Sequence, residues 1–330
     1  MKKFLVVLGV FLLLCAGVGV GVMFKFNRDY GLTMANAVSH ETRATPETRL
    51  RAVVQLDKAR GYLQRILPPA EQLPPFMALL PWKPADLLPS IMPRELALLA
   101  SPSQNASEID VRLFVNERRG GPQLCKALNE STLFTAASPI QWDTGRMVMK
   151  ERGILEARGA IPIPAGLMDV VRKTWPQLNT EPSPYLSSGE SFFEAVLDNR
   201  NGELVTLVAS IMTASGQDVL TQLKDPSAAG FMPMLASVTD VRLEANPASL
   251  DKLVVTLRLN ATSAAPSGLE FIFNGVAIPQ LALQLQPKGL KLEGKTKWLE
   301  KENALTGKFE ITGMESLFAP FLQAPAAPPA

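Results

Sequence analysis

Short stretches in which apolar and polar residues alternate dominate this chain, and a period of two is typical of half-buried β-strands. The stretches Leu96 to Ala100 and Ile109 to Val115 flank a turn rich in Ser, Asn and Pro, which predicts a hairpin with a long loop. A second hairpin is expected from Arg146 to Glu151 and from Ile154 to Ile163. Strands that are joined by short turns pair in opposite directions, so the pattern predicts an antiparallel sheet.

The rest of the chain continues this alternation and adds helical segments. Further strands are expected at 192–197, 204–212, 238–245, 253–260, 280–286, 289–298 and 304–312. Helical periodicity and proline starts predict helices at 46–67, 122–128, 164–175, 215–223 and 315–322. The predicted fold class is therefore α+β with β predominant, in which short amphipathic helices cover antiparallel hairpins.

The apolar pattern of residues 84–175 returns in the same order between residues 228 and 322, which predicts a two-fold internal repeat. The aligned pairs, at spacings of 144 to 151 residues, include Leu99 with Leu243, Leu113 with Leu257, Leu155 with Leu305 and Met147 with Trp298. The alternative is similar patterning without duplication, because amphipathic hairpins resemble one another whatever their origin.

These patterns divide the chain into six segments. They are a transmembrane anchor or signal peptide (1–26), a tether with an amphipathic helix and a proline-rich linker (27–83), a first α+β repeat (84–175), a connecting hairpin and helix (176–227), a second α+β repeat (228–322) and a disordered tail (323–330).

The first segment decides the expected location of the protein. Residues 4–24 carry no charge and are numerous enough to cross ~30 Å of hydrocarbon as a helix. Lys2 and Lys3 precede this span, which favours a cytoplasmic amino terminus and an exported body, although Lys25 and Arg28 follow closely. A cleaved signal peptide and a lipid anchor on Cys15 are the alternatives, and all three place the body outside the cytosol. We expect a single-pass membrane protein with an extracytoplasmic body, periplasmic in a bacterium.

Composition excludes several classes of protein. The formal net charge is only +2, so the chain has no overall positive field for nucleic acid, and we expect no nucleic-acid partner. Two cysteines cannot form a disulfide framework or a metal cluster. The single histidine, His40, lies in the expected tether, where nothing is expected to orient it as a base. We therefore expect no catalytic residue, cofactor or metal.

Two partial motifs in the sequence do not predict a site. The glycine-rich run from Gly17 to Gly21 lies inside the apolar span with no strand before it, so it does not predict a phosphate loop. Ser249 and Lys252 have the spacing that brings a serine nucleophile and a lysine base together on a helix, but they follow Pro247 and lead into a strand. A hairpin turn is the better interpretation.

The clearest charged surface is a row of lysines on the predicted strand 289–298. Lys291, Lys295 and Lys297 project from one face of this strand, and Leu292 and Trp298 project from the other. Such a row is a possible binding face for an anionic lipid headgroup or envelope polymer. Such a row is more often a solvated face or an edge strand protected against aggregation.

Three functional hypotheses follow. The first is a membrane-anchored, non-enzymatic binding or scaffold protein of the cell envelope, which contacts the membrane through residues 4–24 and also another envelope protein or a lipid. The second is a lipid or apolar-ligand binding or transfer protein with a groove between sheet and helices. The third is a hydrolase that works without a histidine base, because carboxylate pairs formed by folding are invisible in a sequence.

Overall fold

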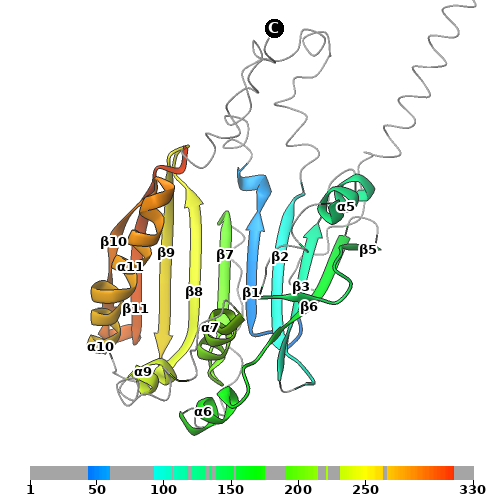
Figure 1. Cartoon of the computed structure of the whole chain (residues 1–330). Coiled ribbons are helices and arrows are strands. Elements are labelled where there is room, and N and C mark those ends of the chain that lie inside the picture. Colours follow the sequence, from blue (N-terminus) through cyan, green and yellow to red (C-terminus); the bar gives the residue numbers. More distant parts are fainter. Residues whose placement is uncertain are drawn as a thin grey trace, which may run out of the picture.

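A single antiparallel sheet organises the molecule (Figure 1). The structure is a computed structural model, and it describes residues 44–59, 93–105, 107–116, 121–130, 134, 139–151, 154–174, 191–214, 221, 231–262 and 266–315. The strands are β1 (Leu50–Gln55), β2 (Glu95–Pro102), β3 (Glu108–Asn116), β4 (Gln141–Trp142), β5 (Val148–Glu151), β6 (Ile154–Pro162), β7 (Phe193–Asp198), β8 (Val238–Pro247), β9 (Lys252–Ala261), β10 (Lys291–Leu299) and β11 (Ala304–Thr312). Their order in the sheet is β10-β11-β9-β8-β7-β1-β2-β3-β6-β4, and β5 also pairs with β6.

The longer helices lie over one face of this sheet (Figure 1). They are α5 (Gly121–Glu130), α6 (Leu167–Thr174), α7 (Glu203–Ala214), α9 (Phe231–Ser237), α10 (Pro266–Ile272) and α11 (Ile278–Leu285), with the π-helical turn η6 (Phe273–Ala277) between the last two. Short 3-10 turns complete the described elements: η2 (Leu56–Ala59), η7 (Gln286–Lys288) and η8 (Glu300–Glu302). The predicted class, β-predominant antiparallel α+β, is confirmed.

The sheet consists of two halves with the same internal order. The first half runs β1-β2-β3-β6-β5 and the second runs β7-β8-β9-β11-β10. The halves join through β1 and β7, which pair antiparallel with Ala52 opposite Ala195. The hydrogen-bonded sheet therefore continues without a break from one half into the other.

Both halves bury apolar side chains beneath their helices. In the first half Val115 and Leu155 pack against Leu124 and Leu128 of α5. In the second half Leu259 and Leu305 pack with Leu269 of α10. Alternation within the strands supplies these residues, since every second side chain of a strand faces the helices.

Most of the predicted elements are confirmed. The two early hairpins, the helix after Pro122, the helix after Pro164 and the strands near 238–245, 253–260, 289–298 and 304–312 all occur, with boundaries shifted by a few residues. Clear alternation or a proline start marked each of these segments in the sequence.

Three predicted elements are wrong. Leu50–Gln55 is a central strand and not part of a helix from 46 to 67, because β2 and β7 hydrogen-bond to it on both sides. Residues 203–214 form helix α7 and not the second arm of a hairpin, because the Asn199 side chain caps the helix start and Gly202 turns the chain at φ +81°. Residues 278–285 form helix α11 and not a strand, since they continue the helix that α10 begins. Alternate leucines imitate a strand in this last segment.

The register also corrects two pairs in the predicted repeat. Leu257 of β9 lies opposite Leu243 of β8. Leu113 of β3, the residue aligned with Leu257, lies opposite Leu98 of β2. Leu243 therefore corresponds to Leu98 and not to Leu99. The hairpin of the second half is one residue shorter, so Leu99 lies on the other face of the sheet. Trp298 lies opposite Leu305, whereas Met149, not Met147, lies opposite Leu155.

Several predictions concern residues outside the described ranges. These are the anchor or signal peptide (1–26), residues 27–43 of the tether, residues 60–67 of the helix predicted at 46–67, the proline-rich linker up to residue 92, most of the helix at 215–223, residues 316–322 of the helix predicted at 315–322 and the tail at 323–330. Within the described ranges, no helix has the length and apolar character needed to cross a membrane.

Candidate functional site

A pocket of about 320 Å³ lies close to the join between the two halves. The ends of β1, β2, β3 and β7 form one side of it, and helices α6 and α7 contribute the other. Its apolar lining residues are Leu50, Ala100, Pro102, Ile109, Ile163, Met168, Leu197 and Leu207. Its polar lining residues are Arg49, Ser101, Ser103, Glu108, Arg172, Asn201, Glu203 and Thr206. Apolar groups thus make up most of the exposed lining, and four charged side chains stand among them.

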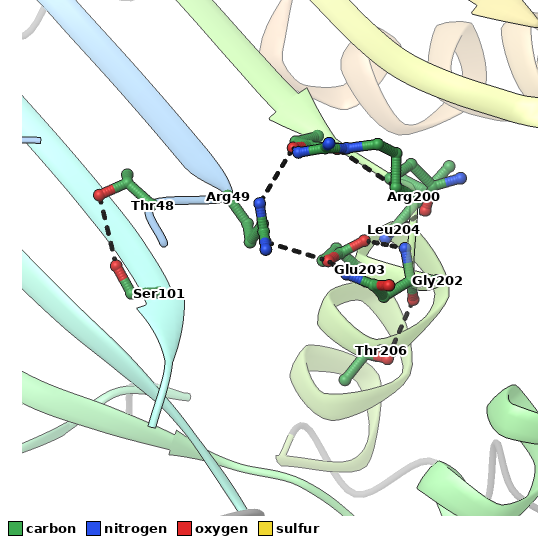
Figure 2. A network of polar contacts seen from close by, with 11 residues as sticks. Thr48, Arg49, Ser101, Arg200, Gly202, Glu203, Leu204 and Thr206 are labelled. Atoms are coloured by element: carbon green, nitrogen blue, oxygen red, sulfur yellow. Dashed lines mark hydrogen bonds and ion pairs between the residues drawn. The ribbon is translucent and has the colours of Figure 1, made fainter. Parts of the chain in front are cut away.

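Arg49 is the central cation of a charged network beside the pocket (Figure 2). Its Nη1 donates to Asp198 Oδ2 at 3.2 Å, and its Nε lies 3.4 Å from Glu203 Oε1. The second contact lacks the alignment of a hydrogen bond, so it is an ion pair and leaves the buried Nε–H without an aligned acceptor. Two acids from the β7–α7 connection therefore share one guanidinium from the start of β1.

Asp198 is held as a carboxylate. Arg200 Nε donates to Asp198 Oδ1 at 2.7 Å, and Arg200 Nη2 donates to Oδ2. Burial raises the pKa of Asp198, but the hydrogen bonds from Arg200 and the charges of Arg200 and Arg49 outweigh burial and hold this pKa below its usual value. The same pairing raises the pKa of Arg200. Asp198 thus serves to fix the two arginines.

Glu203 behaves differently from Asp198. Burial raises the pKa of Glu203, and the negative charge of Asp198 adds to this effect. Hydrogen bonds from the backbone N–H of Asn201 at 2.8 Å and from its side chain at 3.0 Å oppose the shift only in part. Glu203 therefore takes up a proton more readily than an ordinary glutamate does.

Asn199 positions the helix that carries Glu203. Its side chain is fully buried, accepts a hydrogen bond from Leu204 N–H at 2.8 Å, and donates to the carbonyl oxygens of Leu235 and Val238 at 3.1 and 2.9 Å. One amide thus connects the start of α7 to the junction of α9 and β8. The rigid connection fixes the wall of the pocket.

The predicted lysine face lies away from this pocket. Lys291, Lys295 and Lys297 are exposed on the edge strand β10, and Thr296 and Trp298 of the same strand face the helices. Lys291 pairs with Glu293 at 2.5 Å, which raises the pKa of the lysine and lowers that of the glutamate. The structure therefore does not bring the lysine row and the pocket together.

The set-aside Ser249–Lys252 motif forms a turn. Lys252 N–H donates to the carbonyl oxygen of Ser249 at 3.3 Å, as in a tight hairpin between β8 and β9. Among the described residues, no group of three or more His, Cys, Asp or Glu side chains is arranged to hold a metal ion.

The comparisons with known proteins identify no relative. No protein-family model and no curated protein matches this chain. Two solved structures align weakly: the tesB protein of Mycobacterium avium subspecies paratuberculosis has 11% identity and a TM-score of 0.14, with 83% of this chain and 81% of that chain covered. The acyl-CoA thioesterase II TesB2 of Mycobacterium marinum has 7% identity and a TM-score of 0.14, with 88% and 86% covered. At these scores neither likeness bears on fold or activity.

The sequence did not reveal Arg49, Asp198 or Glu203 as site residues. The predicted helix at 46–67 includes Arg49, and the predicted strands at 192–197 and 204–212 leave residues 198–203 as a turn between them. The usable signal was the polar cluster Asn199 to Glu203 directly before an apolar run, which is also typical of a helix start.

Proposed function

We propose that this chain is a non-enzymatic binding protein of the cell envelope that takes an apolar molecule with a polar end group in its central pocket. The pocket itself carries the proposal. Its volume of about 320 Å³ falls within the usual range for small-molecule sites, and its mostly apolar lining includes a few charged groups. Arg49 and Arg172 are suited to the polar end of such a molecule, and Leu50, Leu207 and Met168 to its apolar part.

The envelope location rests on the sequence alone. Residues 4–24 form an uncharged span preceded by Lys2 and Lys3, and a charged and polar stretch follows it. In this proposal the span anchors the chain in the membrane and the folded body lies outside the cytosol. Protease protection in intact cells, with the body digested only from the extracytoplasmic side, would test this orientation.

We also propose that the two halves arose by duplication and pair about a pseudo-twofold axis that passes between Ala52 and Ala195. The equal strand orders support it, and so do repeated side-chain contacts. Asn129 of α5 clamps the backbone of Met147, with Met147 N–H donating at 2.6 Å and the Asn129 amide donating to Met147 O at 3.0 Å. Asn274 clamps Thr296 in the same way, at 2.8 and 3.0 Å.

A second repeated contact lies next to the axis. Ser101 Oγ donates to Thr48 Oγ1 at 3.4 Å in the first half, and Asn246 Nδ2 donates to Ser191 Oγ at 3.2 Å in the second. Both contacts join the residue two positions before the inner strand to the penultimate residue of the next strand. Chance similarity does not explain this agreement easily, because the four residues that make the two contacts in one half would all have to match four residues of the other half by coincidence.

The pocket is tested by filling it. Leu207→Trp places a large ring in the pocket, and Val208→Trp, one residue further along α7 where the side chain is 45% exposed, is the matched control. We expect the full chain to bind a fluorescent fatty-acid analogue and the Leu207 variant to lose this binding several-fold, while the control retains it. Equal binding by both variants would refute the pocket as the site.

Glu203 favours a second candidate function, acid-base catalysis. Its raised pKa and its place in an apolar pocket are typical of a general acid. Its oxygens, however, already accept two hydrogen bonds from Asn201. Ester hydrolysis by the purified chain that disappears in Glu203→Gln, with analogue binding retained, would support this function over simple binding.

The lysine row on β10 remains a proposed anionic face. Lys295 and Lys297 are exposed on the same side of the edge strand. Replacing both with Gln is expected to weaken binding to an anionic polymer such as heparin, and unchanged binding would leave edge protection as the role of the row.

A further inference from the structure

The second half of the sheet has a charged and polar face on the side away from its helices. Helices α10 and α11 lie over the opposite face (Figure 1), where Leu305 of β11 and Trp298 of β10 pack beside Leu269 of α10. Successive side chains of a strand point to opposite faces of a sheet. Lys308 of β11 and the lysines Lys295 and Lys297 of β10 therefore point away from the helices.

Most other basic side chains on this outer sheet face have an acid partner. The ion pairs are Lys291 with Glu293, Lys252 with Glu310, Arg258 with Glu302 and Arg242 with Asp240. Within the described ranges, Lys295, Lys297 and Lys308 form no ion pair, although all three are exposed. These three residues form the lysine cluster, whose positive charge is not compensated by the protein.

The lysine cluster brings like charges together across two strands. Lys308 lies directly opposite Lys295, and Lys297 follows two positions along β10 on the same face. Like charges directly opposite each other destabilise a sheet. Lysines on an edge strand can protect it against aggregation, but β11 is an inner strand that pairs with β9 and β10. Edge protection therefore does not account for Lys308.

The first half compensates the corresponding charge. Leu113 lies opposite Ala157, and its counterpart Leu257 lies opposite Gly307, so Arg158 of β6 corresponds to Lys308. Arg158 Nε donates to Glu156 Oε1 at 2.6 Å. Thr306 occupies the place of Glu156 in the second half. The acid that neutralises this position in one half is thus absent from the other.

A groove adjoins the lysine cluster on the same face. Thr256 of β9 lies opposite Lys308 and lines this groove, which has a volume of about 350 Å³, within the usual range for small-molecule sites. Its lining residues are Arg242, Glu244, Thr256, Arg258 and Asn260. Since acids pair with both arginines, the lysines at its border supply the uncompensated charge.

From these observations we infer that the lysine cluster and the adjoining groove bind a small soluble anion that carries several phosphate groups. Lysine binds phosphate as a point charge, so the phosphates of such an anion would offset the repulsion among the three lysines. The inference rests on the anionic face proposed for β10, adds Lys308 to it and names the class of ligand. It is separate from the central pocket.

The neighbouring acids favour a small anion over an extended one. Glu293 and Glu310 lie directly opposite each other, beside the pair Lys295 and Lys308 and on the same face. A lipid surface or a long anionic polymer laid over this face would meet these carboxylates as well as the lysines. An anion confined to the cluster and the groove avoids this repulsion.

The first test measures binding of inorganic tripolyphosphate to the full chain in nonionic detergent, by calorimetry at low salt. Lys308→Gln removes the charge that edge protection does not explain. Lys173→Gln removes an equal charge from an exposed position on α6 and is the matched control. We expect several-fold weaker binding for Lys308→Gln and unchanged binding for Lys173→Gln.

A second pair of variants places the acid of the first half into the second. Thr306 lies opposite Lys297 and two positions before Lys308, so Thr306→Glu puts a carboxylate between the two lysines. Thr306→Gln is the uncharged control. We expect Thr306→Glu to lose tripolyphosphate binding and Thr306→Gln to retain it. The thermal unfolding midpoint of the Glu variant should be no lower than that of the Gln variant, and both should still bind the fatty-acid analogue.

Three results would overturn the inference. Equal losses in Lys308→Gln and Lys173→Gln would mean that general charge attraction holds the anion. Unchanged binding in Lys308→Gln, with weaker binding when Lys295 and Lys297 are both replaced by Gln, would leave only the face proposed for β10. Absence of tripolyphosphate binding, with heparin binding that Thr306→Glu abolishes, would identify a long anionic polymer as the occupant.

Discussion

The two halves of the sheet agree in backbone and differ in side-chain chemistry where they meet. Asp198 N–H donates to the carbonyl of Arg49 at 2.8 Å, and Gln55 N–H donates to the carbonyl of Phe192 at 2.7 Å. These bonds correspond to each other across the join. The first pair carries the charges of the network beside the pocket, and the second carries an amide and an aromatic ring. Equivalent backbone hydrogen bonds therefore carry charged side chains at one end of the join and uncharged side chains at the other.

The helix layer repeats this contrast. Both helices are fixed by an asparagine clamp, but α5 presents an ion pair to solvent and the helix Pro266–Leu285 presents Phe271 and Leu283. The features common to both halves are those that hold strands and helices together. The features that differ lie on the pocket and on the outer surface, and the pocket is where we propose that a ligand binds.

The largest effect is expected at Asn199, which has no counterpart amide in the first half. Leu56 and Asn199 make equivalent backbone bonds, to Arg94 O at 2.9 Å and to Thr239 O at 2.8 Å, but only Asn199 adds three side-chain bonds. Asn199→Ala leaves two buried carbonyls and a helix N–H without partners, and we expect it to destabilise the fold by about 3 kcal/mol. Urea unfolding measures this difference.

Thr213→Ala on the exposed side of α7 serves as the control and should cost less than about 0.5 kcal/mol. A cost for Asn199→Ala no greater than that of the control would mean that the amide does not connect α7 to β8, and the proposed difference between the halves would fail at this point.

The next effect concerns the clamps made by Asn129 and Asn274, which are expected to contribute equally to the stability of the two halves. Asn129→Ala and Asn274→Ala each remove an acceptor and a donor from a strand backbone, so each should destabilise the fold by about 2 kcal/mol. The clamps lie at opposite ends of the sheet, so the double variant should show additive losses. Urea unfolding of the three variants measures both quantities.

Unequal costs, differing by more than about 1 kcal/mol, would contradict the equivalence of the two clamps. Gln280→Ala, an exposed change on the same helix as Asn274, is the matched control and should be nearly neutral.

The sequence predicted the strands and the general class better than it predicted the join. Alternation marks β3, β9 and β11 clearly, because each has one face against helices and neighbours on both sides. It failed for β1, because Arg51 within this short strand and Arg49 just before it resemble the start of an amphipathic helix. Only the pairing with β2 and β7, which are distant in sequence, stabilises β1 as a strand.

The candidate site was out of reach for the same reason. Arg49 and Asp198 are 149 residues apart in the chain, and their contact exists only because β1 pairs with β7. No local pattern encodes a pairing at this separation. The lysine row, by contrast, lies on one strand, and its exposure on one face was predictable from alternation.

A smaller effect is expected from the pH dependence of the network. The folded pKa of Glu203 is raised, so its contribution to stability is present below the unfolded value near 4.5 and is lost as the pH rises through the folded pKa. Asp198 has a lowered pKa, so its contribution is present above 3.8 and is lost as the pH falls through its folded pKa. Glu203→Gln should gain stability relative to the unaltered chain as the pH rises above 4.5.

Urea unfolding at a series of pH values measures this relative gain. Since Gln55 occupies the place of Asp198 in the first half, Gln55→Ala is the uncharged control and should show no pH-dependent difference. A constant offset between Glu203→Gln and the unaltered chain across the pH range would contradict the buried position of the carboxyl.

The smallest effects are expected at Lys126 and Phe271, two exposed helix residues that each lie three positions before a clamp asparagine. Exposed ion pairs one helical turn apart contribute only about 0.3 to 0.5 kcal/mol, so Lys126→Ala should lower the free energy of unfolding by no more than this. Phe271 is 73% exposed, so Phe271→Ala should also lower the free energy of unfolding only slightly, although phenylalanine is large. Urea unfolding of the two variants measures both changes. A loss above about 1 kcal/mol for Phe271→Ala would place the ring in the core, where it could not serve as a contact surface. Near-neutral results at both positions mean that the aromatic ring does not contribute to folding, so its position on the outer face requires an explanation outside the fold.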